Sequence, residues 1–122
     1  MSDATKIIQS FENMLAKGQD NALLRYGLGN AYVQQQDFPN ALIHLAQCVV
    51  LNPKYSAGWK AYGNALSAAQ QFKKAVEIYT QGIAIAEENK DKQAVKEMQV
   101  FLKRAQKHLV QDWTRYHFYI IN

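Results

Sequence analysis

GNAYVQQQDFPNA occupies residues 29–41, and GNALSAAQQFKKA occupies residues 63–75. The Gly-Asn-Ala start, the phenylalanine near the end and the final alanine all recur at one fixed separation, that between Gly29 and Gly63. A repeat with this interval is typical of proteins in which each unit is one supersecondary element that buries its apolar face against its neighbours. The sequence therefore predicts a repeat protein.

The match extends well beyond these two stretches. Its spacing resembles the tetratricopeptide repeat (TPR), in which a helix, a turn and a second helix make up a unit of about 34 residues. The resemblance implies an all-α fold, a right-handed superhelix of antiparallel helix pairs. The residues that carry it are Leu28, Gly29, Tyr32, Ala41, Leu45, Cys48 and Pro53 in the first unit, and Trp59, Tyr62, Gly63, Leu66, Ala75, Tyr79 and Gly82 in the second.

Small and large residues alternate within the repeat for a steric reason. Gly29 and Gly63 fall in the middle of predicted helices, where glycine costs up to about 1 kcal/mol relative to alanine. We therefore expect each of them to let a neighbouring helix approach closely, while large side chains such as Leu45 and Tyr79 fill the remaining space.

Turn and cap residues set the expected boundaries. Gly18 should end a first helix, Pro39 should lie in the first turn of a later one, and Ser56 should cap the next. No proline follows the second unit, so its last helix should continue to about Asn89. The expected organisation is one domain over 1–122, with an N-terminal helix (3–18), TPR units (22–55 and 56–89), a capping helix (91–116) and a tail (117–122).

The two flanking helices are predicted from the same periodicity. One repeat interval before Ala41 and Leu45 lie Ile7 and Phe11, so the first helix resembles the second helix of a unit that lacks its first. At the other end, Met98 follows Tyr62 at an interval two positions longer than the repeat, which predicts that the last helix caps the array.

Composition limits the class of protein. The chain has 122 residues, of which 48% are hydrophobic and 20% charged, with a formal net charge of +4. No apolar stretch is long enough to span a membrane and no secretory leader is evident, so a cytoplasmic protein is expected. Seven of the 14 Lys and Arg residues lie between Lys90 and Arg115. This basic helix is the only feature that favours nucleic-acid binding, which we consider a minor alternative.

No catalytic pattern emerges. His44, His108 and His117 are scattered, and the chain has one cysteine, so the spacing of a metal site is missing. Cys48 falls where the repeat needs a small buried residue, which favours core packing over reactivity. We therefore expect neither an enzyme nor a cofactor, and instead a module that binds proteins.

The concave face is the expected binding surface. TPR proteins generally bind a peptide or a partner protein along this face, which the first helix of each unit lines. Asparagines there can hold a peptide backbone and lysines can attract carboxylates. With the longer interval for the last helix, the predicted peptide-binding residues are Tyr26, Asn30, Val33, Lys60, Asn64, Ser67, Lys96 and Lys103. The same interval also places Arg104 on this face.

One local pair suggests a particular ligand. Some TPR proteins hold the C-terminal carboxylate of a chaperone with a lysine and an asparagine one helical turn apart, and Lys60 and Asn64 match that pair. Tyr26 stands where the first unit would need its own lysine. An acidic or C-terminal peptide and a merely solvated groove therefore both remain open.

The last residues, VQDWTRYHFYIIN, are unusually aromatic. YHFYII alone would suit a strand, whereas the residues before it could continue the last helix. The segment could fold back on the repeats, fill the concave groove, or pair with another copy to form a homodimer. The residues predicted to act in self-association are Trp113, Tyr116, Phe118, Tyr119 and Ile120.

Overall fold

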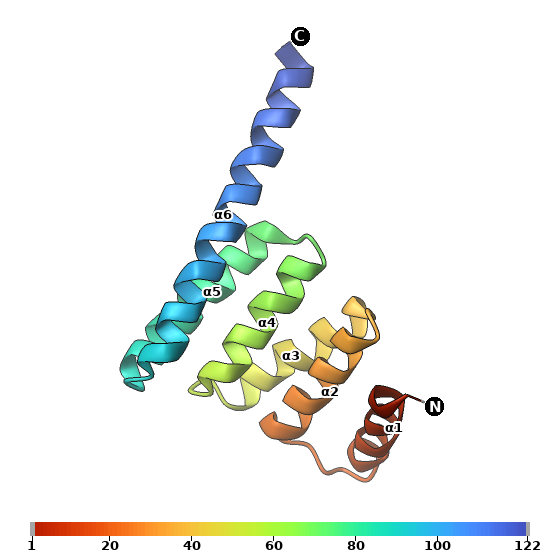
Figure 1. The fold of residues 1–122 in the computed structure, drawn as a ribbon. Coiled ribbons are helices and arrows are strands. Elements are labelled where there is room, and N and C mark those ends of the chain that lie inside the picture. The colour runs from red at the N-terminus through yellow and green to blue at the C-terminus, as the bar shows by residue number, and fades with distance from the viewer. Residues whose placement is uncertain (1, 122) are drawn as a thin grey trace.

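The computed structural model describes residues 2–121, except for the side chain of Ile121. Within this range every regular element is a helix (Figure 1), which confirms the predicted all-α fold. Met1 and Asn122, which belong to the predicted domain and tail, lie outside the described residues. The helices are α1 (Asp3–Ala16), α2 (Ala22–Gln34), α3 (Phe38–Leu51), α4 (Ser56–Ala68), α5 (Phe72–Glu88) and α6 (Lys92–Ile121).

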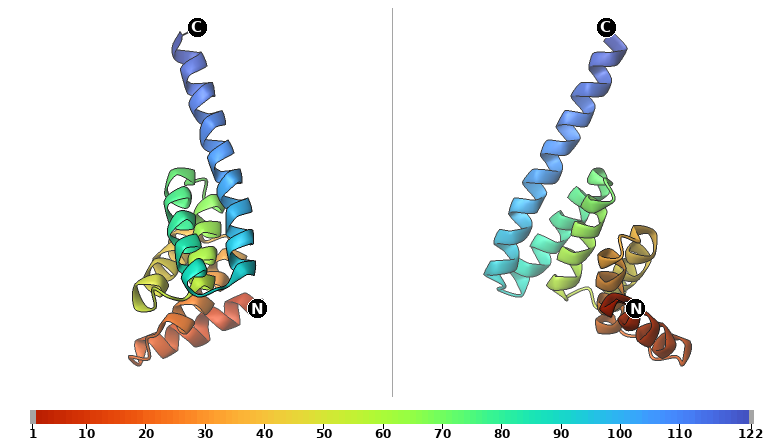
Figure 2. Two further views of the ribbon diagram at one scale, coloured as in Figure 1. Left: turned by 90° about the vertical axis from the view of Figure 1, so that its left-hand side faces the viewer. Right: turned by 45° about the vertical axis from the view of Figure 1, so that its right-hand side comes forward.

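The helices stack in the order of the sequence. α2 packs on α3 and α4 packs on α5 as antiparallel pairs, while α1 lies against α2 and α6 against α5 (Figures 1 and 2). α4 also contacts both α2 and α6. The first helix of each pair therefore forms, with α6, one continuous side of the array.

The turns that follow α1, α2, α4 and α5 share one geometry. Gly18, Gln36, Gln70 and Lys90 each have a positive φ, between 57° and 82°. The residue after each donates its backbone N–H to a carbonyl in the last helical turn, for example Asp37 to Tyr32 at 2.9 Å. This is a Schellman motif, which satisfies the last helical carbonyls.

The glycines of the repeat allow close packing, as predicted. A Cβ atom on Gly29 would collide with the Leu45 side chain, and one on Gly63 would collide with the ring of Tyr79. Leu45 and Tyr79 are fully buried and hold equivalent positions in the two units. The two units therefore repeat the same contact, in which a large residue of the second helix occupies the place of a missing side chain on the first.

Ser56 does not cap α4. It is the first residue of that helix, and Tyr55 occupies the cap position without a side-chain hydrogen bond. The Ser56 hydroxyl instead donates to Asp91 Oδ2 at 3.1 Å, while Asp91 Oδ1 accepts from the backbone N–H of Ala94. Ser56 therefore joins the start of α4 to the start of α6.

The predicted tail is part of α6. This helix has 30 residues, about 45 Å in length, and its second half projects beyond the other helices (Figure 2). Trp113 and His117 stack one helical turn apart, and His117 Nδ1 lies 2.9 Å from the Trp113 carbonyl oxygen. Since residues 117–121 continue the helix, the prediction of a separate tail and the alternative in which it folds back on the repeats are wrong for these residues.

Candidate functional site

A groove between α4 and α6 is the hollow that best matches the predicted binding face. It has a volume of about 400 Å³, and the rings of Tyr79 and Phe101 lie side by side in it with their centroids 6.0 Å apart. The residues that line it are Asn64, Ser67, Ala68, Gln70, Phe72, Tyr79, Phe101, Arg104, Ala105 and His108.

Cationic and aromatic groups meet on the α6 side of this groove. The Arg104 guanidinium lies 5.9 Å from the centre of the Phe101 ring, and the His108 ring stacks on Phe72 at 4.4 Å. Arg104 is exposed, so its donors are accessible to a ligand. A guanidinium held beside an aromatic ring can bind a carboxylate through two parallel hydrogen bonds.

Tyr79 fixes two of the predicted residues on α4. Its hydroxyl donates to Asn64 Oδ1 and lies 3.3 Å from the Ser67 hydroxyl. Burial raises the pKa of Tyr79, so the hydroxyl keeps its proton and remains a donor. The Asn64 side chain is therefore held in place before any ligand binds, with its oxygen already in use.

Lys60 already has a carboxylate partner. Its Nζ lies 3.0 Å from Glu97 Oε2, and both side chains are about one-third exposed. A peptide carboxylate at this position would have to compete with Glu97. The helices α4 and α6 begin at Ser56 and Lys92, two positions more than the repeat interval apart, as expected.

The other predicted residues lie elsewhere. Tyr26 packs edge-on against Tyr55, with ring centroids 5.3 Å apart, and Asn30 and Val33 are half-buried on α2. Lys96 lines a second hollow between α5 and α6, and Lys103 is exposed on α6 without lining the α4–α6 groove. The groove thus brings together Asn64 and Ser67 of the predicted set.

Two of the polar residues in the groove were not among the predicted ones. Gln70 occupies the turn after α4, and His108 lies far along α6. The spacing of His108 from Arg104, one helical turn, could have suggested that both share a face of the helix. Its contact with Phe72 depends on how α6 packs against α5, which the sequence does not specify.

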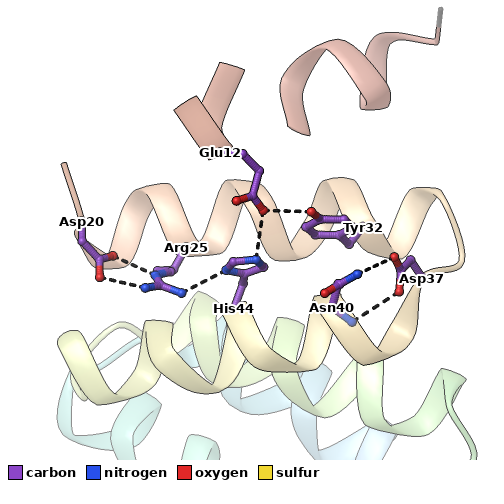
Figure 3. Close-up of polar contacts among 7 residues, drawn as sticks. All are labelled: Glu12, Asp20, Arg25, Tyr32, Asp37, Asn40 and His44. Atoms are coloured by element: carbon purple, nitrogen blue, oxygen red, sulfur yellow. Dashed lines mark hydrogen bonds and ion pairs between the residues drawn. The ribbon is translucent and has the colours of Figure 1, made fainter. Parts of the chain in front are cut away.

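A polar network outside the groove attaches α1 to the repeats (Figure 3). Glu12 of α1 accepts a hydrogen bond from the Tyr32 hydroxyl at 2.8 Å and lies 3.4 Å from His44 Nε2. Arg25 lies between Asp20, with which it makes two hydrogen bonds, and His44 Nδ1 at 3.1 Å.

This network favours one state of His44. Because Arg25 can only donate, Nδ1 must be the acceptor and Nε2 carries the hydrogen that points to Glu12. Burial lowers the pKa of His44 below its usual 6.5, which favours the neutral ring. Burial and the Glu12 carboxylate raise the pKa of Tyr32 to about 12, so its hydroxyl remains a donor.

We expect the stability of the protein to fall as the pH drops below about 6.5. In the unfolded chain His44 takes up a proton near that pH, but in the folded chain, where Arg25, Glu12, Asp20 and Tyr32 surround it, only at lower pH. The unfolded state then binds more protons, with a slope of at most about 1.4 kcal/mol per pH unit. Urea unfolding at a series of pH values measures this slope. His44→Gln should have a shallower slope, and equal slopes for the two proteins would contradict the assignment.

The single cysteine has no reactive character. Cys48 is fully buried, and burial raises the pKa of its thiol to about 11. A thiol of this kind is protonated at neutral pH and inaccessible to substrates. The structure therefore agrees with the packing role expected for this residue.

The similarity to known proteins is clear at the level of sequence. No family model matches the chain. It is 51% identical over 98 residues to the TPR repeat-containing protein PA0015 of Pseudomonas aeruginosa, a match that covers 80% of this chain and 93% of that protein. The chain belongs to the TPR family. Protein BPP2914 of Bordetella parapertussis, solved in solution, is 37% identical and has a TM-score of 0.73, covering 90% of this chain and 93% of that one.

Two more distant TPR structures agree with the fold alone. The TPR2B domain of yeast Sti1, in a complex with pHsp70, has a TM-score of 0.80 at 14% identity and covers 86% of this chain and 84% of that one. A TPR domain protein of Salinibacter ruber has a TM-score of 0.67 at 22% identity, over 72% and 89% of the two chains. Proteins of the TPR family are in general protein-interaction modules, and this chain belongs to that general class.

Two further observations concern the part of the chain that the structure describes. None of its helices combines the length and the apolar character needed to cross a bilayer. Across the same residues, His, Cys, Asp and Glu side chains do not gather in groups of three or more that could hold a metal ion.

Proposed function

We propose that this TPR protein binds an extended, acidic segment of a partner protein in the groove between α4 and α6. The observation that carries the proposal is the position of Arg104, whose guanidinium lies beside Phe101 in a hollow that also contains Tyr79 and Asn64. The half-buried ring of Phe101 would receive an apolar side chain of the segment, and Arg104 would bind a carboxylate.

The charge of the surrounding helices supports an acidic ligand. The chain carries a formal net charge of +4, and α6 contributes Lys103 and Lys107 close to Arg104 in sequence. These positive groups would increase the rate at which an acidic segment reaches the groove. Since the Sti1 domain with a similar arrangement of helices is in a complex with pHsp70, the fold is compatible with a protein ligand.

The ion pair with Glu97 modifies the role expected for Lys60. It makes Lys60 a residue that positions the wall of the groove, and Arg104 becomes the proposed contact to the ligand. The proposed compartment is the cytoplasm, because a buried, protonated cysteine needs no oxidising environment.

Substitution of Arg104 should weaken binding of an acidic peptide. The probe is a set of short peptides that contain glutamates among apolar residues, each paired with a version in which glutamine replaces glutamate. We expect Arg104→Ala to lower the affinity for the acidic peptides about tenfold, because a hydrogen bond between charged groups is lost. Isothermal titration calorimetry measures the affinity, and NMR shift mapping locates the site.

Lys103→Ala is the matched control. It removes the same charge from the neighbouring position, which does not line the groove, so we expect less than about a twofold change. Equal effects of the two substitutions would show that only net charge attracts the peptides. Shift changes confined to residues outside the groove would refute the proposed site.

A further inference from the structure

The apolar face that holds α6 against the repeats continues along its projecting half. In the first half of the helix, Ala94, Met98 and Ala105 are buried in the core shared with α5. Further steps of four, four, three and four residues lead from Ala105 to the stripe formed by Leu109, Trp113, Tyr116 and Ile120. Positions with these separations lie on one side of a helix.

Most of this stripe is exposed to solvent. Leu109 is half-buried at its base, whereas Trp113, Tyr116 and Ile120 are 61%, 63% and 67% exposed. Large apolar side chains in a contiguous exposed row mark an interface in a soluble protein. Asp112 and Arg115 are the only residues with formal charges between residues 109 and 120, and they cancel. An occupant of this stripe should therefore be apolar and need carry no particular charge.

We propose that the stripe pairs with the same stripe of a second copy in an antiparallel helix pair. The spacing of four, three and four residues reads the same in both directions. A two-fold axis opposite the midpoint between Trp113 and Tyr116 therefore sets each Trp113 against Tyr116 of the other copy. The same axis sets each Leu109 against Ile120 of the other copy, so that the four apolar residues of each stripe all meet apolar residues.

The body of the protein permits one direction of pairing. The stripe continues the face of α6 that packs on α5, so a parallel partner helix would need its own first half to occupy the space of α5. An antiparallel partner approaches from the free end, where Figure 2 shows α6 extending beyond the other helices. Its last turn then reaches a hollow of about 440 Å³ lined in part by Phe72 and Leu109, at the place where α6 leaves the body.

The area of the stripe suits a weak dimer. Aromatic side chains bury about 150–250 Å² each when fully covered, and the two stripes together would bury on the order of 1,000 Å². This is close to the lower limit for a specific interface. We therefore expect dimers to dissociate at roughly micromolar concentrations.

Sedimentation velocity over a range from about 1 to about 300 μM tests the proposal, since this range spans the expected dissociation constant. The full chain should shift from monomer to dimer as its concentration rises. Trp113→Glu should raise the dissociation constant at least about tenfold, because it places charge in the centre of the stripe. Gln111→Glu, which adds the same charge on the opposite side of the helix, should leave it within about twofold. A full chain that stays monomeric throughout, or equal effects of the two substitutions, would overturn the proposal.

Spin labels test the direction of the pair. Labels on Lys107→Cys and Thr114→Cys report separately, because Cys48 is buried and should not react. In the antiparallel dimer the two Thr114→Cys labels lie near the two-fold axis. The two Lys107→Cys labels should be displaced from each other by about 20 Å more along the helix direction, so their distance should be clearly longer. Equal distances at the two sites would indicate a parallel pair and reject the proposed arrangement. Trp113→Glu should still bind acidic peptides, so failure of the dimer and failure of the groove are distinguishable.

Discussion

Replacement of Tyr79 by alanine should lower the free energy of unfolding by about 4 kcal/mol, because truncation of a buried aromatic residue loses its packing and leaves a cavity. Tyr79 is among the largest side chains that are fully buried, and its ring occupies the space beside Gly63. It also lies in the core cluster that joins α3, α4, α5 and α6. Urea unfolding followed by far-UV circular dichroism measures the change.

Tyr79→Phe separates packing from hydrogen bonding at the same position. It keeps the ring and removes the hydroxyl that contacts Asn64 and Ser67. We expect it to cost about 1 kcal/mol. If the two substitutions were equally destabilising, the hydroxyl contacts rather than the ring would hold this region together.

Gly29→Ala should lower the free energy of unfolding by about 2 kcal/mol, although alanine is the better helix former by about 1 kcal/mol. The added Cβ would collide with Leu45, and the atoms nearest to it include the branched Cγ close to the backbone of α3. Because Leu45 is fully buried, it has no room to turn away. Chemical denaturation again measures the effect.

Gly27→Ala is the control in the same helix. Its Cβ would meet the edge of the Phe11 ring, which belongs to the half-buried side chain of an end helix and can move. We expect a change of less than about 1 kcal/mol. If the two substitutions were equally destabilising, the cause would be a general intolerance of α2 to larger side chains. The specific contact between Gly29 and Leu45 would then not explain the effect.

Much of the fold follows from the sequence because the repeat is a steric pattern. The recurrence of glycine, large residues and alanine at one interval indicates which helices pair and which positions are close. Gly18 ends α1 with a φ of 82°, as expected, and α5 ends at Glu88, just before the expected limit. The helix ends depend on residues close by in the sequence, and the helix pairing depends on contacts between adjacent repeat units, so both can be inferred from the sequence pattern.

The features that were missed depend on longer-range geometry. Gln36 and Gln70 adopt the positive φ usually taken by glycine, so the residue type at these two turns does not indicate their backbone conformation. The aromatic residues after Trp113 have a preference for strands, but the helix that precedes them continues through them.

The binding site is less predictable than the fold. Asn64 and Ser67 were assigned to the groove because the repeat pattern fixes the exposed side of α4. Arg104 follows from the expected interval of the last helix, whereas His108 joins the groove through the packing of α6. Lys60 is not a free cation because it is paired with Glu97. The helices α4 and α6 are separated in the sequence by α5, so individual contacts between their side chains cannot be inferred from periodicity alone.

The polar attachment of α1 implies that this helix can open locally while the remaining repeats stay folded. The main core cluster draws on α3 to α6, whereas the only buried residue of α1 is Ala4. In a linear array each unit is stabilised by its neighbours, so an end that is held by a few side-chain contacts opens at a lower free energy than the centre. The N-terminal helix is therefore a separate unit of local opening. Protonation of His44 would disturb its contact with Arg25 of α2, whereas the Glu12 carboxylate of α1 favours the protonated ring.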